Sequence, residues 1–318
     1  MSTLAHCRAN ELEERPEGRL WLIEQLWAEQ GVGIVGGEPK CCKSLLALDI
    51  AVSVASGAPA LRKFPPAQTG RVLLFAAEDA PHIVRRRLEG IACAAGVDFA
   101  ALDIHAITTP TVRLDLGEDQ RRLQETVEAL RPKLLVLDPF VRLHRIDENV
   151  AAEVAPVLGY LRELQRRFEM AVLLVHHARK GAAHARAGQA LRGSSEIHAW
   201  GDSNLYLRRT GSTLRLTIEQ RAAPGAEGLA VELRACGEAL ALHLVEADTA
   251  DGLAPRSPAP SALERVEQAL GAALLPLTRT QLRDACQMRT SNMGEALDTL
   301  ISQGRVLKSA DGYQLVRP

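Results

Sequence analysis

The sequence predicts an α/β fold with a mostly parallel sheet, an antiparallel extension at one edge of that sheet, and a small C-terminal domain. Three observations lead to this prediction. Short apolar runs alternate with helical periodicity from about residue 31 to residue 175. Strand-like runs then follow one another up to residue 245, and a segment rich in proline and alanine precedes a compact helical unit. Apolar strands that alternate with helices are typical of a parallel sheet covered on both faces.

The elements follow in order along the chain. We expect parallel strands at 31–35, 71–77, 103–107, 133–137 and 170–175. We expect the helices between them at 43–56, 81–95, 118–130 and 151–168. Four antiparallel strands then complete the sheet, at 202–209, 213–220, 229–233 and 240–245, with a turn at 210–212 joining the first two.

The end of the chain predicts a separate domain. Residues 1–248 form the first domain, residues 249–261 a linker, and residues 262–318 the second domain. Three helices are expected in the second domain, the second of them capped by threonine and the third ended by Gly304. A β-hairpin around residues 310–312 follows. Three helices and a hairpin are typical of a winged helix-turn-helix.

The composition excludes several classes of protein. Of the 318 residues, 47% are hydrophobic and 24% charged, which excludes a mainly disordered chain. The formal net charge of -1 restricts any nucleic-acid surface to a local one. The aromatic content of 3% argues against a sheet that stacks bases. No apolar run is long enough to cross a membrane, so we expect a cytoplasmic protein with no membrane partner.

The cysteines predict a reducing environment. There are six, with no CxxC pair and no zinc-finger spacing to histidine, and the N-terminus lacks a signal-peptide core. We therefore expect no disulfide framework.

One glycine-rich segment carries the functional prediction. It matches the phosphate-loop pattern GxxxxGK[ST] at every fixed position but one, followed by a helix, and we assign nucleotide binding to Gly37, Glu38, Pro39, Lys40, Cys41, Cys42, Lys43, Ser44 and Leu45. Backbone amides of such a loop cradle phosphates. Lys43 would neutralise the β- and γ-phosphates, and Ser44 would hold Mg²⁺. The alternative is an ordinary strand-to-helix turn with a chance lysine.

Cys42 is the departure, because it stands where the pattern has glycine. A Cβ atom there restricts the backbone and could slow turnover. A second idea is a redox switch: a thiol at a helix N-terminus has a lowered pKa, and a bond between Cys41 and Cys42 would deform the loop.

Acidic residues follow two of the predicted strands. Asp138 suits a residue that bonds to water on Mg²⁺, and Glu78 suits a general base that orients the attacking water. Asp79 alternatively caps the next helix, and a strand-end cap is also the alternative for Asp138.

Histidines and basic residues follow the fifth strand. His176 and His177 would lie beside the γ-phosphate, where a histidine could sense the nucleotide state; packing in the core is the alternative. Basic residues continue at Arg179, Lys180, Arg186 and Arg192. A basic loop suits a nucleic-acid backbone or the phosphates of a neighbouring subunit, and a solvated surface loop is the alternative.

These segments together resemble a known family. The order GEPKCCKS, FAAED, LVLDPFVRLHRIDEN, LLVHHARKG and QALRGSSE, over roughly residues 20–220, resembles the RecA-like ATPases of the plasmid RepA replicative helicase type, related to the hexameric DnaB-like helicases and RecA. The resemblance implies an ATPase that forms a hexameric ring with ATP between subunits. It implies the phosphate-loop pair for Lys43 and Ser44, the catalytic glutamate for Glu78, the Walker B aspartate for Asp138 and the γ-phosphate reader for His177.

The sequence departs from this family at a second position. The arginine finger of the family matches Asp202 here, and the candidates to replace it are Arg192, Lys180, Arg208 and Arg209. A trans arginine, where one operates, raises the rate by about 10³–10⁵.

The predicted winged helix suggests a duplex DNA partner. Its third helix opens with Arg289, Thr290, Ser291 and Asn292, where base contacts usually arise, and Arg305, Lys308 and Arg317 would contact phosphates. From Arg256 onward eight basic and six acidic residues leave a net charge of +2, and a protein-binding module is the alternative.

The sequence therefore predicts a Mg²⁺-dependent, DNA-linked motor ATPase, with single-stranded DNA at its core and duplex DNA at the winged helix. A nucleotide-gated DNA-binding regulator or replication initiator, with slow or no hydrolysis, is the alternative.

Overall fold

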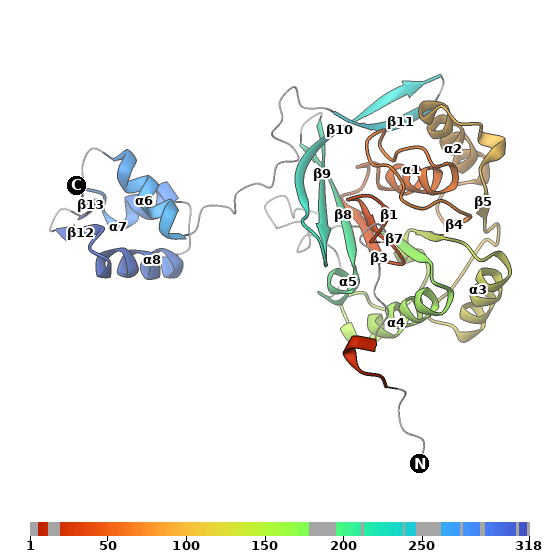
Figure 1. The fold of residues 1–318 in the computed structure, drawn as a ribbon, viewed down its shortest axis with the longest axis horizontal. Helices are drawn as coiled ribbons and strands as arrows, with labels where there is room; N and C mark the ends of the chain where they lie inside the picture. Colours follow the sequence, from red (N-terminus) through yellow and green to blue (C-terminus); the bar gives the residue numbers. More distant parts are fainter. Residues whose placement is uncertain are drawn as a thin grey trace, which may run out of the picture. The chain divides into compact units, whose positions relative to one another are not determined.

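The chain folds into two compact units. In the computed structural model these are Met1–Gly252 and Leu253–Pro318, and each is described here by itself (Figure 1). The residues that the structure describes are 6–11, 20–177, 195–210, 213–237, 239–245, 262–273, 276–286, 290–309 and 312–316. The predicted linker at 249–261 lies outside them.

A nine-stranded sheet organises the first unit. Its strand order is β11-β10-β9-β8-β3-β7-β6-β4-β5. The strands that pair in parallel are β3 Val32–Gly37, β4 Val72–Ala76, β5 Ile104–Ala106, β6 Leu134–Asp138, β7 Ala171–His177 and, through β3, β8 Ser203–Thr210. The antiparallel extension adds β9 Thr213–Gln220, β10 Ala226–Cys236 and β11 Ala239–Leu244. The predicted mostly parallel sheet with an antiparallel edge is confirmed.

Helices cover both faces of this sheet, which explains why its central strands are apolar along their whole length. One face packs on α1 Lys43–Ser56 and α2 Pro81–Ala95, and the other on α3 Gly117–Leu130, α4 Ala151–Phe168 and the short α5 Ser195–Trp200 (Figure 1). Each face of the sheet has its own hydrophobic core, and neighbouring residues of β3 point to different ones. Val35 packs in the core under α1 and α2, and Ile34 packs in the core under α3 and α4. The predicted bounds of α1, α2 and α4 are correct, and α3 begins one residue before its prediction.

Some strands differ from their predicted bounds. β7 continues through two histidines because His176 and His177 pair in parallel register with Gly36 and Gly37. β10 begins three residues before its predicted start, since Ala226 already pairs with Ile218 ahead of an irregularity in register. A small hairpin of β1 Trp21–Ile23 and β2 Trp27–Ala28 was not predicted.

The expectation of no disulfide is wrong for one pair. Cys93 on α2 is bonded to Cys236 at the end of β10, with a Cα–Cα distance of 6.5 Å. These residues are 143 positions apart, so no local spacing could indicate the pair. The antiparallel extension brings them together, because β10 and β11 pack against α2.

The second unit consists of three helices and a hairpin. They are α6 Ala262–Ala272, α7 Arg279–Cys286 and α8 Thr290–Ser302, followed by β12 Val306–Ser309 and β13 Gly312–Leu315. Thr278 caps α7 by accepting a hydrogen bond from the Gln281 amide, while the Gln281 side chain accepts one from the Thr278 amide. Gly304 adopts a left-handed conformation after α8. Val266, Leu282 and Leu300 are among the residues of a separate small core.

In the part of the chain that the structure describes, every helix is too short or too polar to span a membrane.

Candidate functional site

A cavity of about 640 Å³ lies at the carboxyl ends of the parallel strands. Its volume is within the range of small-molecule sites. Eight of the residues predicted for nucleotide, metal or catalysis line it, namely Lys40, Cys42, Lys43, Ser44, Leu45, Glu78, Asp138 and His177. They come from segments up to 137 positions apart, which the parallel sheet brings to one edge, as is usual for ligand sites in such folds.

The glycine-rich loop connects β3 directly to α1. β3 ends at Gly37, where an added Cβ would lie 2.3 Å from the backbone oxygen of Leu207, so the loop starts at a place that only glycine fits. The Lys43 side chain is buried and its Nζ atom donates to the Glu38 backbone oxygen at 2.7 Å. The first amides of α1 have no partner within the helix, as at any helix N-terminus, and no side chain caps it. The loop therefore offers amides and one ammonium group to an anion.

Cys42 adopts a backbone conformation that favours glycine. Its φ is 67° and its ψ is 25°, in the left-handed region, and Lys40 also has a positive φ of 64°. An L-residue in this region costs about 1–2 kcal/mol relative to its usual conformations. The Cys42 Sγ atom lies 4.0 Å from Nη2 of Arg209, at the end of β8. The backbone at this position thus has a conformation that favours glycine, and the Cβ atom of Cys42 strains it.

The two adjacent thiols do not have the lowered pKa that we expected. Burial raises the pKa of Cys41 and of Cys42, and outweighs the nearby charges of Lys43 and Arg209. Neither sulfur is in a disulfide. A raised pKa disfavours the thiolate, which argues against a Cys41–Cys42 redox switch.

Asp138 and Ser44 can together hold a divalent cation. Asp138 ends β6, is buried and is hydrogen-bonded to the Ser44 side chain. Burial raises the pKa of Asp138 to about 6, and the carboxylates of Asp79 and Glu78 contribute. A buried carboxyl beside a hydroxyl and two further acids fits Mg²⁺, which is bound by one or two carboxylates plus phosphate oxygens. The following 3₁₀ turn, η4 Phe140–Arg142, has no side-chain cap, so Asp138 is not a cap.

Glu78 and Asp79 each form an ion pair. The Glu78 carboxylate accepts from Nε of Arg142 at 2.8 Å. Asp79 pairs with Arg87 on α2. The expectation that Asp79 caps α2 is wrong, since Ala80 is the N-cap and Pro81 opens the helix. The contact of Arg142 with Glu78 was not predicted from the sequence. It depends on the turn after β6, which places Arg142 next to Glu78.

The two histidines have different environments. His177 is half-buried and lines the cavity, beside Gly37 in the register of β3 and β7. His176 is 1% exposed and points to the opposite face, where its ring lies edge-on to Phe140 at 5.9 Å between centroids. The core alternative therefore applies to His176, and the position beside the phosphate loop belongs to His177.

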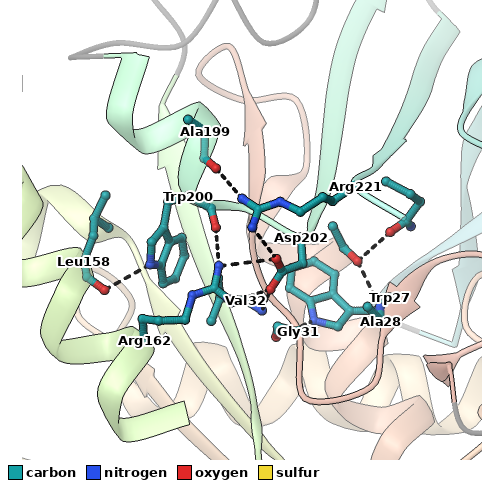
Figure 2. A network of polar contacts seen from close by, with 12 residues as sticks. Trp27, Ala28, Gly31, Val32, Leu158, Arg162, Ala199, Trp200, Asp202 and Arg221 are labelled. Carbon is teal, nitrogen blue, oxygen red and sulfur yellow. Dashed lines mark hydrogen bonds and ion pairs between the residues drawn. The ribbon is translucent and has the colours of Figure 1, made fainter. Parts of the chain in front are cut away.

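Asp202, at the position of the expected arginine finger, belongs to a structural network (Figure 2). Its carboxylate accepts from the Val32 amide at 3.1 Å and pairs with Arg162 of α4 and with Arg221 after β9. Figure 2 shows both guanidinium groups turned toward this one carboxylate. Val32 begins β3, so the network lies at the end of that strand away from the phosphate loop. Asp202 thus connects α4 to the sheet.

Several predicted residues lie outside the described part of the chain. These are Arg179, Lys180, Arg186, Arg192, Arg289 and Arg317, together with the side chains of Ser291 and Asn292. In the second unit Lys308 is exposed on β12, and Arg305 forms an ion pair with Glu267 at 2.7 Å.

Two groups of cavity residues were not predicted. Ile83, Arg86 and Arg87 come from α2, and Leu233, Ala239 and Leu240 from the β10–β11 hairpin. The hairpin residues follow the phosphate loop by about 190 positions, and the packing of β10 and β11 against α2 brings them to it.

Comparison with known families agrees with this geometry. A family model described as an AAA domain matches residues 2–183. The match includes the loop between β3 and α1, both acidic strand ends and His177.

Proposed function

Since the chain belongs to the AAA domain family and is a P-loop ATPase, we propose that it couples Mg²⁺-dependent ATP hydrolysis to work on DNA, as a ring-forming motor of the replicative-helicase type. The observation that supports this most directly is the meeting of Lys43, Ser44, Glu78 and Asp138 around one cavity. Phosphoryl transfer needs little beyond such positioning and charge stabilisation.

The phosphate-loop, acidic and histidine residues of the cavity each have a role in this proposal. The amides of the loop and the Lys43 ammonium bind the phosphates, and Ser44 and Asp138 hold Mg²⁺, which neutralises charge on the β- and γ-phosphates when bound. Glu78 orients the attacking water, and His177 contacts the γ-phosphate. The ion pair with Arg142 engages one oxygen of the Glu78 carboxylate, Oε1, and so competes with this role.

A further cation near the phosphates is proposed from the end of β8 or from a neighbouring subunit. Arg209 is a described candidate, since its guanidinium lies next to Cys42 in the loop. Arg208, Lys180 and Arg192 remain candidates from the sequence, and the hexameric ring would supply such a residue in trans.

The second unit is proposed to be a winged helix that binds duplex DNA. Its three helices followed by an antiparallel hairpin suit this architecture. α8 would enter the major groove and the β12–β13 hairpin would contact phosphates through Lys308. The ion pair of Arg305 with Glu267 leaves Arg305 less suited to that role.

Two observations favour a second candidate, a nucleotide-gated DNA-binding regulator with slow hydrolysis. Cys42 strains the phosphate loop, and Arg142 holds the catalytic glutamate. Both features affect turnover more than binding.

The experiment that separates these candidates is steady-state ATPase activity with and without single-stranded DNA, together with mass in solution in a non-hydrolysable ATP analogue. A motor requires stimulation by DNA and a mass that rises with nucleotide. DNA-independent turnover combined with ATP-dependent duplex binding would support the regulator instead.

Three variants test the assigned residues. Lys43→Ala should abolish nucleotide binding, and Glu78→Gln should keep binding but lose hydrolysis. Glu89→Gln, which removes a partly exposed carboxylate of α2 that lies outside the cavity and pairs with Arg85, is the matched control. Retained hydrolysis in Glu78→Gln would place the general base elsewhere.

A further inference from the structure

We propose that the β10–β11 hairpin forms the subsite for the base of the bound nucleotide, within the same chain as the phosphate loop. This inference rests on the proposed function, because it places a nucleoside triphosphate in the 640 Å³ cavity. It gives a role to the cavity residues that come from the hairpin and have none in the proposed function.

The hairpin presents two leucines to the cavity from its inward face. Residues that alternate along a strand share a face, so Leu233 lies on the same side of β10 as the buried Val231. On β11, Leu240 lies on the same side as the buried Leu242, which pairs directly with Leu233. Yet Leu233 is 36% exposed and Leu240 is 49% exposed. The core-facing side of the hairpin therefore extends beyond the core, over the cavity.

Helices α1 and α2 add two apolar side chains to the cavity. Ile83 in the first turn of α2 and Leu45 in the first turn of α1 line the same cavity. From α2 the cavity also receives Arg86 and Arg87, and Arg87 is paired with Asp79. One cavity is therefore lined by the phosphate loop and the acids and also by four large aliphatic side chains, with Arg86 and Arg87 of α2 among them.

The hairpin is fastened to α2 at the site, so it is a fixed wall of the cavity. Gly90 of α2 lets it approach, because a Cβ at Gly90 would lie 2.3 Å from the Cβ of Ala239. Glycine inside a helix costs about 0.5–1 kcal/mol relative to alanine, a cost that this contact explains. One turn further along α2, Cys93 is bonded to Cys236 of β10.

The occupant follows from the chemistry of this lining. A ligand that uses all of it carries phosphates for the loop and a group with apolar faces for the leucines, which describes a nucleotide. Burial of the two leucines by the base would remove apolar surface from water and so favour binding. Inorganic triphosphate carries the phosphates without the base, so comparing it with ATP tests the subsite directly.

The test compares the dissociation constants of MgATP and of Mg²⁺-tripolyphosphate, measured on the full chain by calorimetry. Leu240→Asn removes apolar contact without adding charge, and should weaken ATP binding by about tenfold while leaving tripolyphosphate binding within about twofold. Leu233→Asn should act in the same direction. Leu116→Asn is the matched control, because Leu116 is 48% exposed and lies outside the cavity; both constants should stay unchanged.

Each outcome decides the inference. A selective loss of ATP affinity in either hairpin variant supports the subsite. Equal effects on both ligands, or no effect on either, in variants that keep the wild-type melting temperature would overturn it, while the proposed function would stand. Failure of the wild-type chain to bind either ligand would instead refute the proposed function and the subsite with it.

Discussion

Replacing Cys42 with glycine tests how the phosphate loop tolerates its unusual residue. Cys42 has a φ of 67°, a conformation that costs an L-residue about 1–2 kcal/mol and costs glycine nothing. Glycine makes the unfolded chain more flexible, which offsets roughly 0.4–1 kcal/mol of that gain. We therefore expect Cys42→Gly to stabilise the first unit by about 0.5–1 kcal/mol. For a unit of this size, that free energy raises the melting temperature by roughly 1–4 °C.

The assay is a thermal melt combined with steady-state ATPase turnover. Turnover should stay equal or rise, because the loop can then adjust around the phosphates without a Cβ atom. Cys42→Ala keeps the Cβ and removes the sulfur, so it separates backbone strain from any role of the thiol. Glu169→Gly is the matched control for strain: Glu169 is exposed after α4, with a φ of 53°, outside the cavity. It should stabilise the unit similarly without changing turnover.

The reasoning fails if Cys42→Gly lowers the melting temperature while Glu169→Gly raises it. A clear fall in turnover in both Cys42 variants would show that the sulfur has a role of its own, next to Arg209.

Three further predictions concern stability. Asp202→Asn should lower the free energy of unfolding by about 1–3 kcal/mol, measured by urea denaturation, because two guanidinium groups lose their charged acceptor. Burial raises the pKa of Asp49 to about 6 from 3.8, despite its ion pair with Arg62; the folded state therefore keeps a proton that the unfolded chain releases. The free energy of unfolding of the wild type relative to Asp49→Asn should thus fall by up to about 3 kcal/mol as the pH rises from 4 to 7. Cys236→Ser should destabilise the oxidised protein by about 2–5 kcal/mol in the same assay, since it opens the long loop closed by Cys93.

Each of these has a contradicting result. If Asp202→Asn unfolds at the same urea concentration as the wild type, water compensates for the lost ion pairs with Arg162 and Arg221. A pH-independent difference for Asp49→Asn, with exposed Glu24→Gln as control, would mean that Arg62 keeps the buried carboxylate ionised at all these pH values. Equal stability of Cys236→Ser and wild type under oxidising conditions would show that the disulfide does not form in solution.

Local sequence patterns predicted most of the fold, because the central strands are short apolar runs and the helices between them have helical periodicity and recognisable ends. α1 illustrates this: a glycine-rich loop precedes it and Gly57 ends it in a left-handed conformation. The hairpin of β1 and β2 was missed because its strands have only three and two residues. Segments this short carry no periodicity.

The candidate site was predictable where chemistry follows strand ends and not where it depends on tertiary contacts. Lys43 was identified by the phosphate-loop pattern, and Asp138 because parallel strands bring their carboxyl ends to one edge. Arg142 and Leu240 were missed, since the first depends on a turn after β6 and the second on the packing of β10 and β11 against α2. Burial also reversed the expected pKa of Cys42, which no sequence pattern reports.

The residues that we propose bind the nucleotide and the residue that we propose activates water are held differently in the structure. Lys43, Ser44 and Asp138 are already in place within one chain, since Lys43 is folded over the loop and Ser44 bonds to Asp138. Glu78, in contrast, is held by Arg142 on an exposed ion pair, an interaction typically worth no more than about 1 kcal/mol. An ion pair this weak can be broken by a bound nucleotide or by a neighbouring subunit. In the proposed ring motor, nucleotide binding can therefore precede assembly, and assembly can set the rate of hydrolysis; in the proposed regulator, binding alone would suffice.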